Sequence, residues 1–293
     1  MNAIILNDKY QYHEDNILGR GGFGLVFKGQ TLNSNQEIAI KVDKKVKYLD
    51  KEMKIYDIIS DSEIMAKKID YFEENNVAYL VMPLYYKSAE EIFRSDKENY
   101  FILKDVLMLG IQMFQQLHFL HAKGIIHLDI KPENMMYNNK NNKFLLIDFG
   151  LTKNFMKNKK HINFKTNSGR CGTLKFMSIN CHQKNTLSRK DDLISLSYAL
   201  IYLYINRLPW KTHRYRNGDK ESNYKKIMME KLDFEEDINS YNIPAPLLFL
   251  FNYSNNLKFK EDPDYHFLIK GFYNYLKINN FKYDGKWSWL NKI

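Results

Sequence analysis

The segment of residues 124–150 constrains this chain more than any other. It contains Gly-Ile-Ile-His-Leu-Asp-Ile-Lys-Pro-Glu-Asn and, after a turn rich in Asn and Lys, Phe-Leu-Leu-Ile-Asp-Phe-Gly. Short apolar runs typical of strands place Asp129 and Asp148 at its two sides, with Lys131 and Asn134 between them. Carboxylate and amide oxygens bind Mg²⁺ that also holds phosphate. The pattern therefore predicts a site for metal-bound phosphate beside a hydroxyl group.

Chain length limits the number of domains, and net charge indicates which partners are favoured. A chain of 293 residues can bury about three quarters of its extended surface, which fits one large domain or two lobes that share a cleft. Its 44 Lys and Arg against 34 Asp and Glu give a formal net charge of +10, which favours acidic or phosphorylated partners. Because Lys and Asn are frequent in every loop, a global compositional bias explains this charge, and specific nucleic-acid binding is not expected.

Two cysteines, Cys171 and Cys181, are too few for a disulfide scaffold or a Cys-type zinc site. A reducing intracellular location, cytoplasmic and/or nuclear, is therefore expected. No stretch has the length of a membrane span, so we expect a soluble protein, and a monomer.

The N-terminal part has the pattern of a hairpin followed by a third strand. Residues 16–18 lead into Gly-Arg-Gly-Gly-Phe-Gly at 19–24, and residues 25–28 lead out. Glycine has no Cβ, so its backbone can approach phosphate oxygens closely. A similar glycine pattern occurs in dinucleotide-binding folds, where a helix follows it, but here a strand follows. The expected nucleotide contacts are Leu18, Gly19, Gly21, Gly22, Phe23 and Gly24. Val26 and Ala39 are expected to line the roof of the pocket for the nucleotide base.

A strand at 38–42 carries Lys41, a candidate to reach phosphate oxygens. Eleven residues later, Glu52 lies in a helical pattern over 48–59 whose apolar positions are Leu49, Met53, Tyr56 and Ile59. We expect Glu52 to form an ion pair with Lys41. The alternative is an ordinary solvated glutamate.

The remaining chain predicts a connector and a helix-rich half. A strand at 77–82 is interrupted by Pro83, and residues 83–86 connect to an amphipathic helix over 101–122. A lysine-rich polar stretch over 150–172 is expected to be a solvated loop or, because it is long and lies beside the expected site, a loop that recognises substrate. Helices are expected over 191–206, 223–231, 246–253 and 263–278. The chain is thus expected to be one domain over 1–293, with an N-lobe to about 82 and a C-lobe from about 87.

In the order glycine-rich hairpin, strand lysine, helix glutamate, His-x-Asp-x-Lys-x-x-Asn and Asp-Phe-Gly, the sequence resembles the eukaryotic protein kinases. The resemblance covers nearly the whole chain. It implies an α+β bilobal fold, with a small antiparallel-sheet N-lobe that carries one helix and a larger, mainly α-helical C-lobe. It also implies ATP and Mg²⁺ as cofactors, and protein substrates.

The resemblance gives each residue a role in phosphoryl transfer. Asp129 would orient the substrate hydroxyl and accept its proton, and Lys131 would offset charge on the transferred group. Asn134 and Asp148 would hold Mg²⁺, and Lys41, fixed by Glu52, would position the phosphates. In the connector, backbone groups would contact adenine, with Tyr85 as the candidate, and Met82 would lie at the back of the pocket.

The C-terminal half resembles the casein kinase 1 family. The resemblance depends on residues 161–164, 172–180, 188–193, 208–210 and 262–265, and Ser-Ile-Asn at 178–180 replaces the usual Ala-Pro-Glu. It implies phosphorylation of Ser or Thr near acidic or phosphorylated residues. Lys175 matches a basic residue of the family that binds an anion. The second basic position is Ser168 here, so Arg170, or Arg214 and Arg216, would complete the anion site.

Three further features depart from relatives. Kinases that are activated by loop phosphorylation have Arg where this chain has Leu128, so we expect activity without such phosphorylation. Pro83 replaces an acidic residue that is common in the connector of the family. The chain ends at Ile293, so the long C-terminal tail that restrains some relatives is not expected.

Two alternatives stay open beside an ATP- and Mg²⁺-dependent protein Ser/Thr kinase. A pseudokinase or scaffold would be favoured if Lys41, Asp129, Asn134 or Asp148 were missing, but all four are present. A small-molecule phosphotransferase with a kinase-like fold would also use Asp129 and Asn134. Lys131 and the segment 172–180 favour a protein substrate instead.

Overall fold

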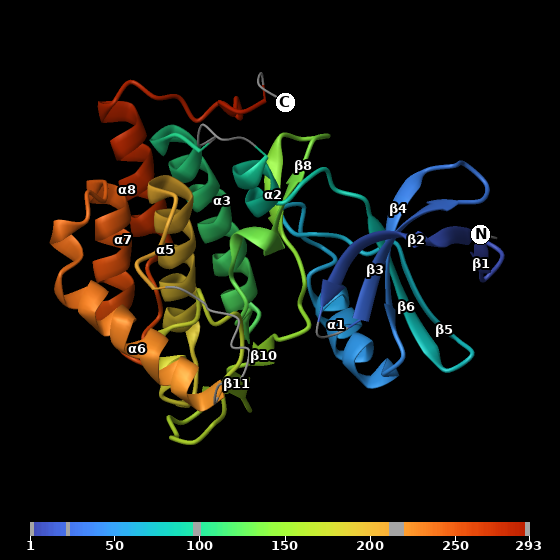
Figure 1. Cartoon of the computed structure of the whole chain (residues 1–293), viewed down its shortest axis with the longest axis horizontal. Coiled ribbons are helices and arrows are strands. Elements are labelled where there is room, and N and C mark those ends of the chain that lie inside the picture. The colour runs from blue at the N-terminus through green and yellow to red at the C-terminus, as the bar shows by residue number, and fades with distance from the viewer. Residues whose placement is uncertain (1–2, 22–23, 96–100, 211–219, 291–293) are drawn as a thin grey trace. The chain divides into compact units, whose positions relative to one another are not determined.

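The computed structural model describes residues 3–21, 24–95, 101–210 and 220–290. The chain forms two compact units, Met1–Tyr86 with Ile147–Gly150, and Lys87–Leu146 with Leu151–Ile293 (Figure 1). Residues 147–150, which were expected in the C-lobe, therefore cluster with the first unit.

The first unit is an antiparallel sheet with one helix (Figure 1). Its six strands have the order β1-β2-β3-β4-β6-β5. Their bounds are β1 Ile4–Leu6, β2 Tyr10–Gly21, β3 Gly24–Thr31, β4 Glu37–Asp43, β5 Asp70–Glu74 and β6 Val77–Pro83, and the helix is α1, Val46–Ile58. Strand β6 ends at Pro83, whose missing N–H fits a strand end. The hairpin and the third strand predicted from the sequence are confirmed.

One face of this sheet carries an apolar core. Side chains alternate between the two faces along a strand, and Ile38 and Ile40 of β4 lie on the same face. They pack with buried aromatic and aliphatic side chains of the neighbouring strands: Leu6, Tyr10, Tyr12, Phe27, Tyr79 and Val81. The opposite face of β4 therefore carries Ala39 and Lys41.

The second unit is mainly helical. Its main helices are α2 Ala89–Arg94, α3 Leu103–Ala122, α4 Ile179–His182, α5 Arg189–Ile205, α6 Lys220–Glu236, α7 Ala245–Asn256 and α8 Tyr265–Ile278. Helices α3, α5, α7 and α8 pack side by side (Figure 1). A Cβ at Gly110 of α3 would lie 2.6 Å from the Phe272 ring of α8, so glycine permits this close packing. Among the described helices, none has both the length and the hydropathy that crossing a membrane requires.

Short strands and 3-10 turns complete this unit. They are β7 Ile125–Ile126, η1 Pro132–Asn134, β8 Met135–Asn138, β9 Lys143–Leu146, β10 Lys153–Asn154, β11 Met156–Lys157, β12 Lys160–His161 and η2 Ile238–Ser240. The four helices expected over 191–278 are all present, with somewhat different bounds. The α+β class expected from the sequence, with a sheet-based unit and a helical unit, is confirmed.

The polar stretch over 150–172 is more ordered at its start than expected. Strand β10 pairs with β7, and β11 pairs with β12. The turn between β11 and β12 has φ of 51° at Asn158 and 59° at Lys159, the left-handed geometry of a two-residue hairpin loop. Phe155, which is buried, anchors the hairpin. The burial of Phe155 thus ties this part of the stretch to the apolar cluster of Ile126, Leu128 and Met177.

Candidate active site

In the first unit, Lys41 lies between two carboxylates. Its Nζ atom is 2.6 Å from Glu52 Oε2 and 2.9 Å from Asp148 Oδ1. Burial alone would lower the pKa of Lys41, but the two carboxylates outweigh it and raise this pKa above its ordinary value. The expected ion pair with Glu52 is therefore present, and the ammonium group is charged at neutral pH and fixed in position.

Helix α1 places Glu52, which is buried, beside the sheet. Leu49, Tyr56 and Ile59 of the predicted apolar stripe are buried as well, and Met53 is partly buried. The ring of Tyr56 packs edge-on against Phe149 at a centroid distance of 5.0 Å, and the backbone N–H of Phe149 donates to the Glu52 carboxylate. The Asp-Phe-Gly segment is thus tied to α1 within this unit.

The predicted nucleotide-binding residues share the face of the sheet that carries Lys41. The strand register places Val26 of β3 opposite Lys41, and Ala39 opposite Met82 of β6. Directly opposed residues of antiparallel strands lie on one face. These side chains therefore lie opposite the apolar core. Tyr85 accepts a hydrogen bond at its hydroxyl from the backbone N–H of Lys67, at 3.3 Å.

The glycine-rich hairpin is described in part. Gly19 pairs with Val26, and Gly21 pairs with Gly24, while the Leu18 side chain is about half exposed. Gly24 has φ of +117°, and a Cβ there would lie 2.2 Å from the carbonyl oxygen of Val42, so only glycine fits. Gly22 and Phe23, at the tip, lie outside the described residues.

In the second unit, the Asp129 carboxylate accepts hydrogen bonds from three side chains. Thr173 Oγ1 donates to Oδ1 at 2.7 Å, Lys131 Nζ donates to Oδ2 at 2.7 Å, and Asn134 Nδ2 donates to Oδ2 at 3.2 Å. Asn134 Nδ2 also donates to the backbone oxygen of Asp129 at 2.9 Å. Three residues that the sequence analysis grouped are thus brought together. Thr173, which lies next to Gly172, was not singled out.

A buried aspartate, Asp192 at the start of α5, fixes the backbone before Asp129. Its oxygens accept the N–H groups of His127 and Leu128, each at 2.7 Å. Leu128 has φ of 70°, a left-handed conformation that is uncommon outside glycine. Asp192 was not predicted as a site residue, although it lies in the segment 188–193 that carries the family resemblance.

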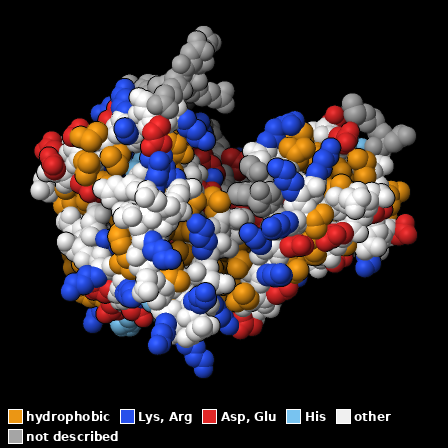
Figure 2. All heavy atoms as spheres, turned by 90° about the horizontal axis from the view of Figure 1, so that it is seen from below, with side chains coloured by type: hydrophobic (Ala, Val, Ile, Leu, Met, Phe, Trp, Pro, Cys, Tyr) orange, Lys and Arg blue, Asp and Glu red, His pale blue; other side chains and the backbone are white. Residues whose placement is uncertain are grey.

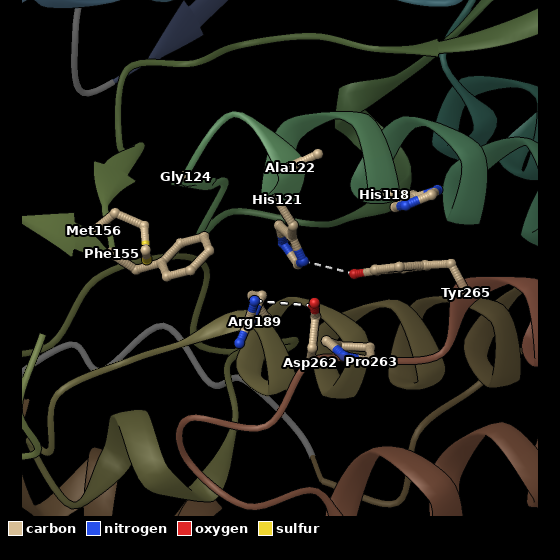
Figure 3. A pocket seen from close by; sticks show the side chains of 10 residues that line it. All are labelled: His118, His121, Ala122, Gly124, Phe155, Met156, Arg189, Asp262, Pro263 and Tyr265. Atoms are coloured by element: carbon tan, nitrogen blue, oxygen red, sulfur yellow. Dashed lines mark hydrogen bonds and ion pairs between the residues drawn. The ribbon is translucent and has the colours of Figure 1, made fainter. Parts of the chain in front are cut away.

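His121, which lines a cavity of about 250 Å³ (Figure 3), also binds the Asp192 carboxylate. His121 Nε2 lies 2.9 Å from Asp192 Oδ2, and His121 Nδ1 lies 2.6 Å from the Tyr265 hydroxyl. A carboxylate only accepts, so Nε2 donates and, in the neutral tautomer, Nδ1 accepts from tyrosine. Arg189 pairs with Asp262 beside this network at 2.9 Å. The cavity's polar residues therefore have structural partners.

The segment after Gly172 is supported by a fully buried lysine. Lys231 Nζ on α6 donates to the backbone oxygens of Met177 at 2.6 Å and Leu174 at 3.1 Å. Burial lowers the pKa of Lys231 to about 7. Trp210 Nε1 donates to the backbone oxygen of Lys175 at 2.8 Å. Lys231 was not predicted as a site residue, because nothing in its local sequence marks it as buried.

The residues expected to form an anion site have partners of their own. Arg170 makes a two-point ion pair with Glu221, at 2.6 and 2.9 Å, and stacks on the Tyr224 ring. Lys175 Nζ lies 3.1 Å from the centroid of the Tyr202 ring, and burial lowers its pKa. An anion at Arg170 would have to displace Glu221. Arg214 and Arg216 lie outside the described residues.

One comparison bears on the identity of this arrangement. The family model described as the protein kinase domain matches residues 12–259. The matched region is most of the chain, and it contains all the candidate residues of both units.

Proposed function

The chain belongs to the protein kinase family, and we propose that it is a Ser/Thr kinase of the casein kinase 1 type. The kinase domain supports ATP-dependent phosphoryl transfer to protein. The Ser/Thr specificity and the casein kinase 1 type are the proposed parts. They are supported by Lys131 two residues after Asp129, and by Ser-Ile-Asn at 178–180.

The observation that carries the proposal is the hydrogen bonding of Asp129. Its two carboxylate oxygens are held by Lys131 and Thr173, which also bond to each other at 3.0 Å. A carboxylate that is fixed in this way can orient a substrate hydroxyl and accept its proton. Thr173 belongs to the segment that would receive the protein substrate. The acceptor site and the base would therefore be aligned by one group of bonds.

Lys41 would hold the α- and β-phosphates of ATP. Its charge is maintained by Glu52 and Asp148, so the ammonium group needs no reorganisation when phosphate arrives. Val26, Ala39 and Met82, on the same face of the sheet, would line the adenine pocket. Lys131 would offset charge on the transferred group.

Amide and carboxylate oxygens are ligand types that suit Mg²⁺, and the ion would neutralise charge on the phosphates when bound. Asn134 directs its Nδ2 group at Asp129, so its Oδ1 atom is available as a ligand. Asp148 would supply a carboxylate, and its side chain is one third exposed.

The packing of Leu128 supports the proposal that the protein is active without loop phosphorylation. This side chain is buried in an apolar cluster with Ile126, Phe155, Met177 and Cys181. Apolar contacts connect the segment after residue 150 to the catalytic segment here, at the place where an arginine would otherwise pair with a phosphate. The preference for acidic or phosphorylated substrates is also part of the proposal, and it comes from the resemblance to the casein kinase 1 family.

The proposal is tested by measuring ATP turnover with casein, an acidic peptide and a panel of metabolites. We expect turnover with the protein and peptide, on Ser or Thr. The variant Asp129→Asn should lower the rate by about 10² to 10⁴ if Asp129 is the general base. Turnover with metabolites alone would favour a small-molecule phosphotransferase, and an inactive protein that still binds ATP would favour a pseudokinase.

A further inference from the structure

A groove with a volume of about 860 Å³ lies on the second unit. We call it the basic groove. Its charged residues are Lys157 and Lys160 of the β11–β12 hairpin, Lys165, and Lys260. Asn163 and Thr186 also line it. Figure 2 shows this unit from the side on which β11 lies in Figure 1, and many Lys and Arg side chains are exposed there.

The described residues that line the basic groove supply no carboxylate to neutralise its positive charge. Among the described residues that line it, none is Asp or Glu. Lys157, Lys160 and Lys165 are exposed, and within the described part of the chain they make no ion pair. Other basic residues of this unit do find carboxylates, as Arg170 does with Glu221. Several like charges in one concave surface produce a positive potential that attracts anionic ligands.

The walls of the basic groove are held in place by hydrogen bonds. Thr186 donates from its backbone N–H to the Lys165 oxygen at 2.8 Å, and its hydroxyl oxygen accepts the Lys165 N–H at 3.0 Å. Lys260 Nζ donates to Asn163 Oδ1 at 3.0 Å. A groove that is already ordered loses little conformational entropy when a ligand binds.

We propose that the basic groove binds an extended acidic segment of the protein substrate, outside the residues that carry out transfer. The inference relies on the proposed function for the substrate class. The lysines come from separate parts of the chain, so a ligand must carry several negative charges along its length to reach them. Ile162 also lines the groove, which suits a peptide with apolar side chains between acidic ones.

The same residues are less suited to nucleic acid. Among the described lining residues there is no Arg, the side chain that binds phosphate in two-point fashion, and no Phe, Tyr or Trp on which a base could stack. Lysine is a point charge on a flexible side chain, so it pairs with the carboxylates of Asp and Glu as well as with phosphate.

Substrate kinetics test the proposal. Two peptides with the same acceptor serine are compared: one carries a run of Glu, and the other carries a run of Gln of the same length. Each pair is made twice, once with the run before the serine and once with the run after it. We expect the Glu run to lower KM about tenfold. A groove variant with Lys157→Glu, Lys160→Glu, Lys165→Glu and Lys260→Glu should lose this difference and keep its kcat and KM for the Gln peptide.

A matched control carries the same charge change elsewhere on the second unit: Lys140→Glu, Lys143→Glu, Lys270→Glu and Lys277→Glu, all at exposed positions. It should keep the preference for the Glu peptide. Equal loss in the control would show an effect of net charge alone, and retention of the preference in the groove variant would show that the groove is not used. Either result would overturn the proposal.

A binding experiment separates the groove from the proposed function. Fluorescent Glu-run peptide is titrated against the Asp129→Asn protein with and without the groove substitutions. Binding that the groove substitutions abolish would support the groove even if no peptide were phosphorylated, in which case only the proposed function would fail. Tighter, groove-dependent binding of a single-stranded oligonucleotide of equal charge would assign the groove to nucleic acid and overturn the proposal.

Discussion

The Oδ1 atom of Asp192 lies 2.7 Å from the backbone nitrogen of Leu128, and this bond supports a left-handed residue immediately before Asp129. The same carboxylate binds the His127 N–H and the His121 ring. Three donors from two different segments therefore converge on one buried charge.

Replacing this carboxylate by an amide should destabilise the protein. In Asp192→Asn the amide NH₂ group would face the N–H donors of His127, Leu128 or His121. The negative charge that strengthens these hydrogen bonds would also be lost. We expect the free energy of unfolding to fall by about 2 to 4 kcal/mol, measured by urea denaturation. The control Asp262→Asn removes a carboxylate that is 81% exposed and should change stability by less than about 1 kcal/mol. Similar losses in both variants would contradict this account.

Lys231 should make stability depend on pH. Its pKa is lowered by burial to about 7, below that of the unfolded chain, so between about pH 7 and pH 10 the unfolded state binds the extra proton. The free energy of unfolding should therefore rise from pH 7 to pH 9, relative to Lys231→Met, by up to about 1.4 kcal/mol per pH unit. Denaturation at several pH values measures this. The exposed neighbour variant Lys226→Met should run parallel to the wild type, and a parallel curve for Lys231→Met would refute the assignment.

Glu52 acts through Lys41, so it is a positioning residue. In Glu52→Gln the Lys41 ammonium group would keep Asp148 as its one ionic partner among the described residues. We expect kcat/KM for ATP to fall by about 10² while the protein stays folded by circular dichroism. Glu63→Gln, at a side chain that is 94% exposed, is the control and should behave as the wild type. Unchanged kinetics in Glu52→Gln would mean that the ion pair has no part in ATP use.

Gly172 should tolerate no Cβ because of a specific contact. Both Gly172 and Gly169 have positive φ, +89° and +81°, but a Cβ at Gly172 would lie 2.4 Å from the Leu128 oxygen, and a Cβ at Gly169 would meet nothing within 4 Å. Each alanine variant carries a conformational cost of about 1 to 2 kcal/mol. Only Gly172→Ala should also displace the catalytic segment and lower kcat/KM by about 10². Equal loss of activity in the two variants would assign the effect to backbone strain.

Leu128 leads to a prediction about phosphorylation. Because this buried side chain contacts apolar neighbours in place of a loop phosphate, the protein freed of phosphate should keep its activity. Phosphatase treatment, followed by mass spectrometry and a peptide assay, measures this. Loss of activity that returns on rephosphorylation would show that another residue binds a loop phosphate.

The sequence was sufficient for features set by local pattern and motif. Lys41 and Glu52 were paired correctly because the motif order requires a cation and a helix carboxylate there. The interior of α3 and α5 followed from apolar periodicity. The hairpin over 156–161 was not predicted, because its many lysines indicated a solvated loop and the burial of Phe155 depends on tertiary contacts.

Features set by tertiary packing could not be predicted in this way. Lys231 and Asp192 are charged residues, which are usually exposed, and their burial depends on partners far along the chain. Arg170 was expected to bind an external anion, but its partner Glu221 is 51 residues away on helix α6. A long-range carboxylate leaves no local signal in the sequence.

The bond between Tyr265 and His121 also bears on where a shortened protein can be cut. The kinase family match ends at residue 259, but Tyr265 begins α8, whose Phe272 ring packs against Gly110. A fragment that stopped at the end of the match would lose the helix that covers α3, and with it the far end of the Tyr265–His121–Asp192 chain of bonds. Fragments for crystallisation or drug screening should therefore retain α8, because the boundary of sequence similarity lies inside the folding unit.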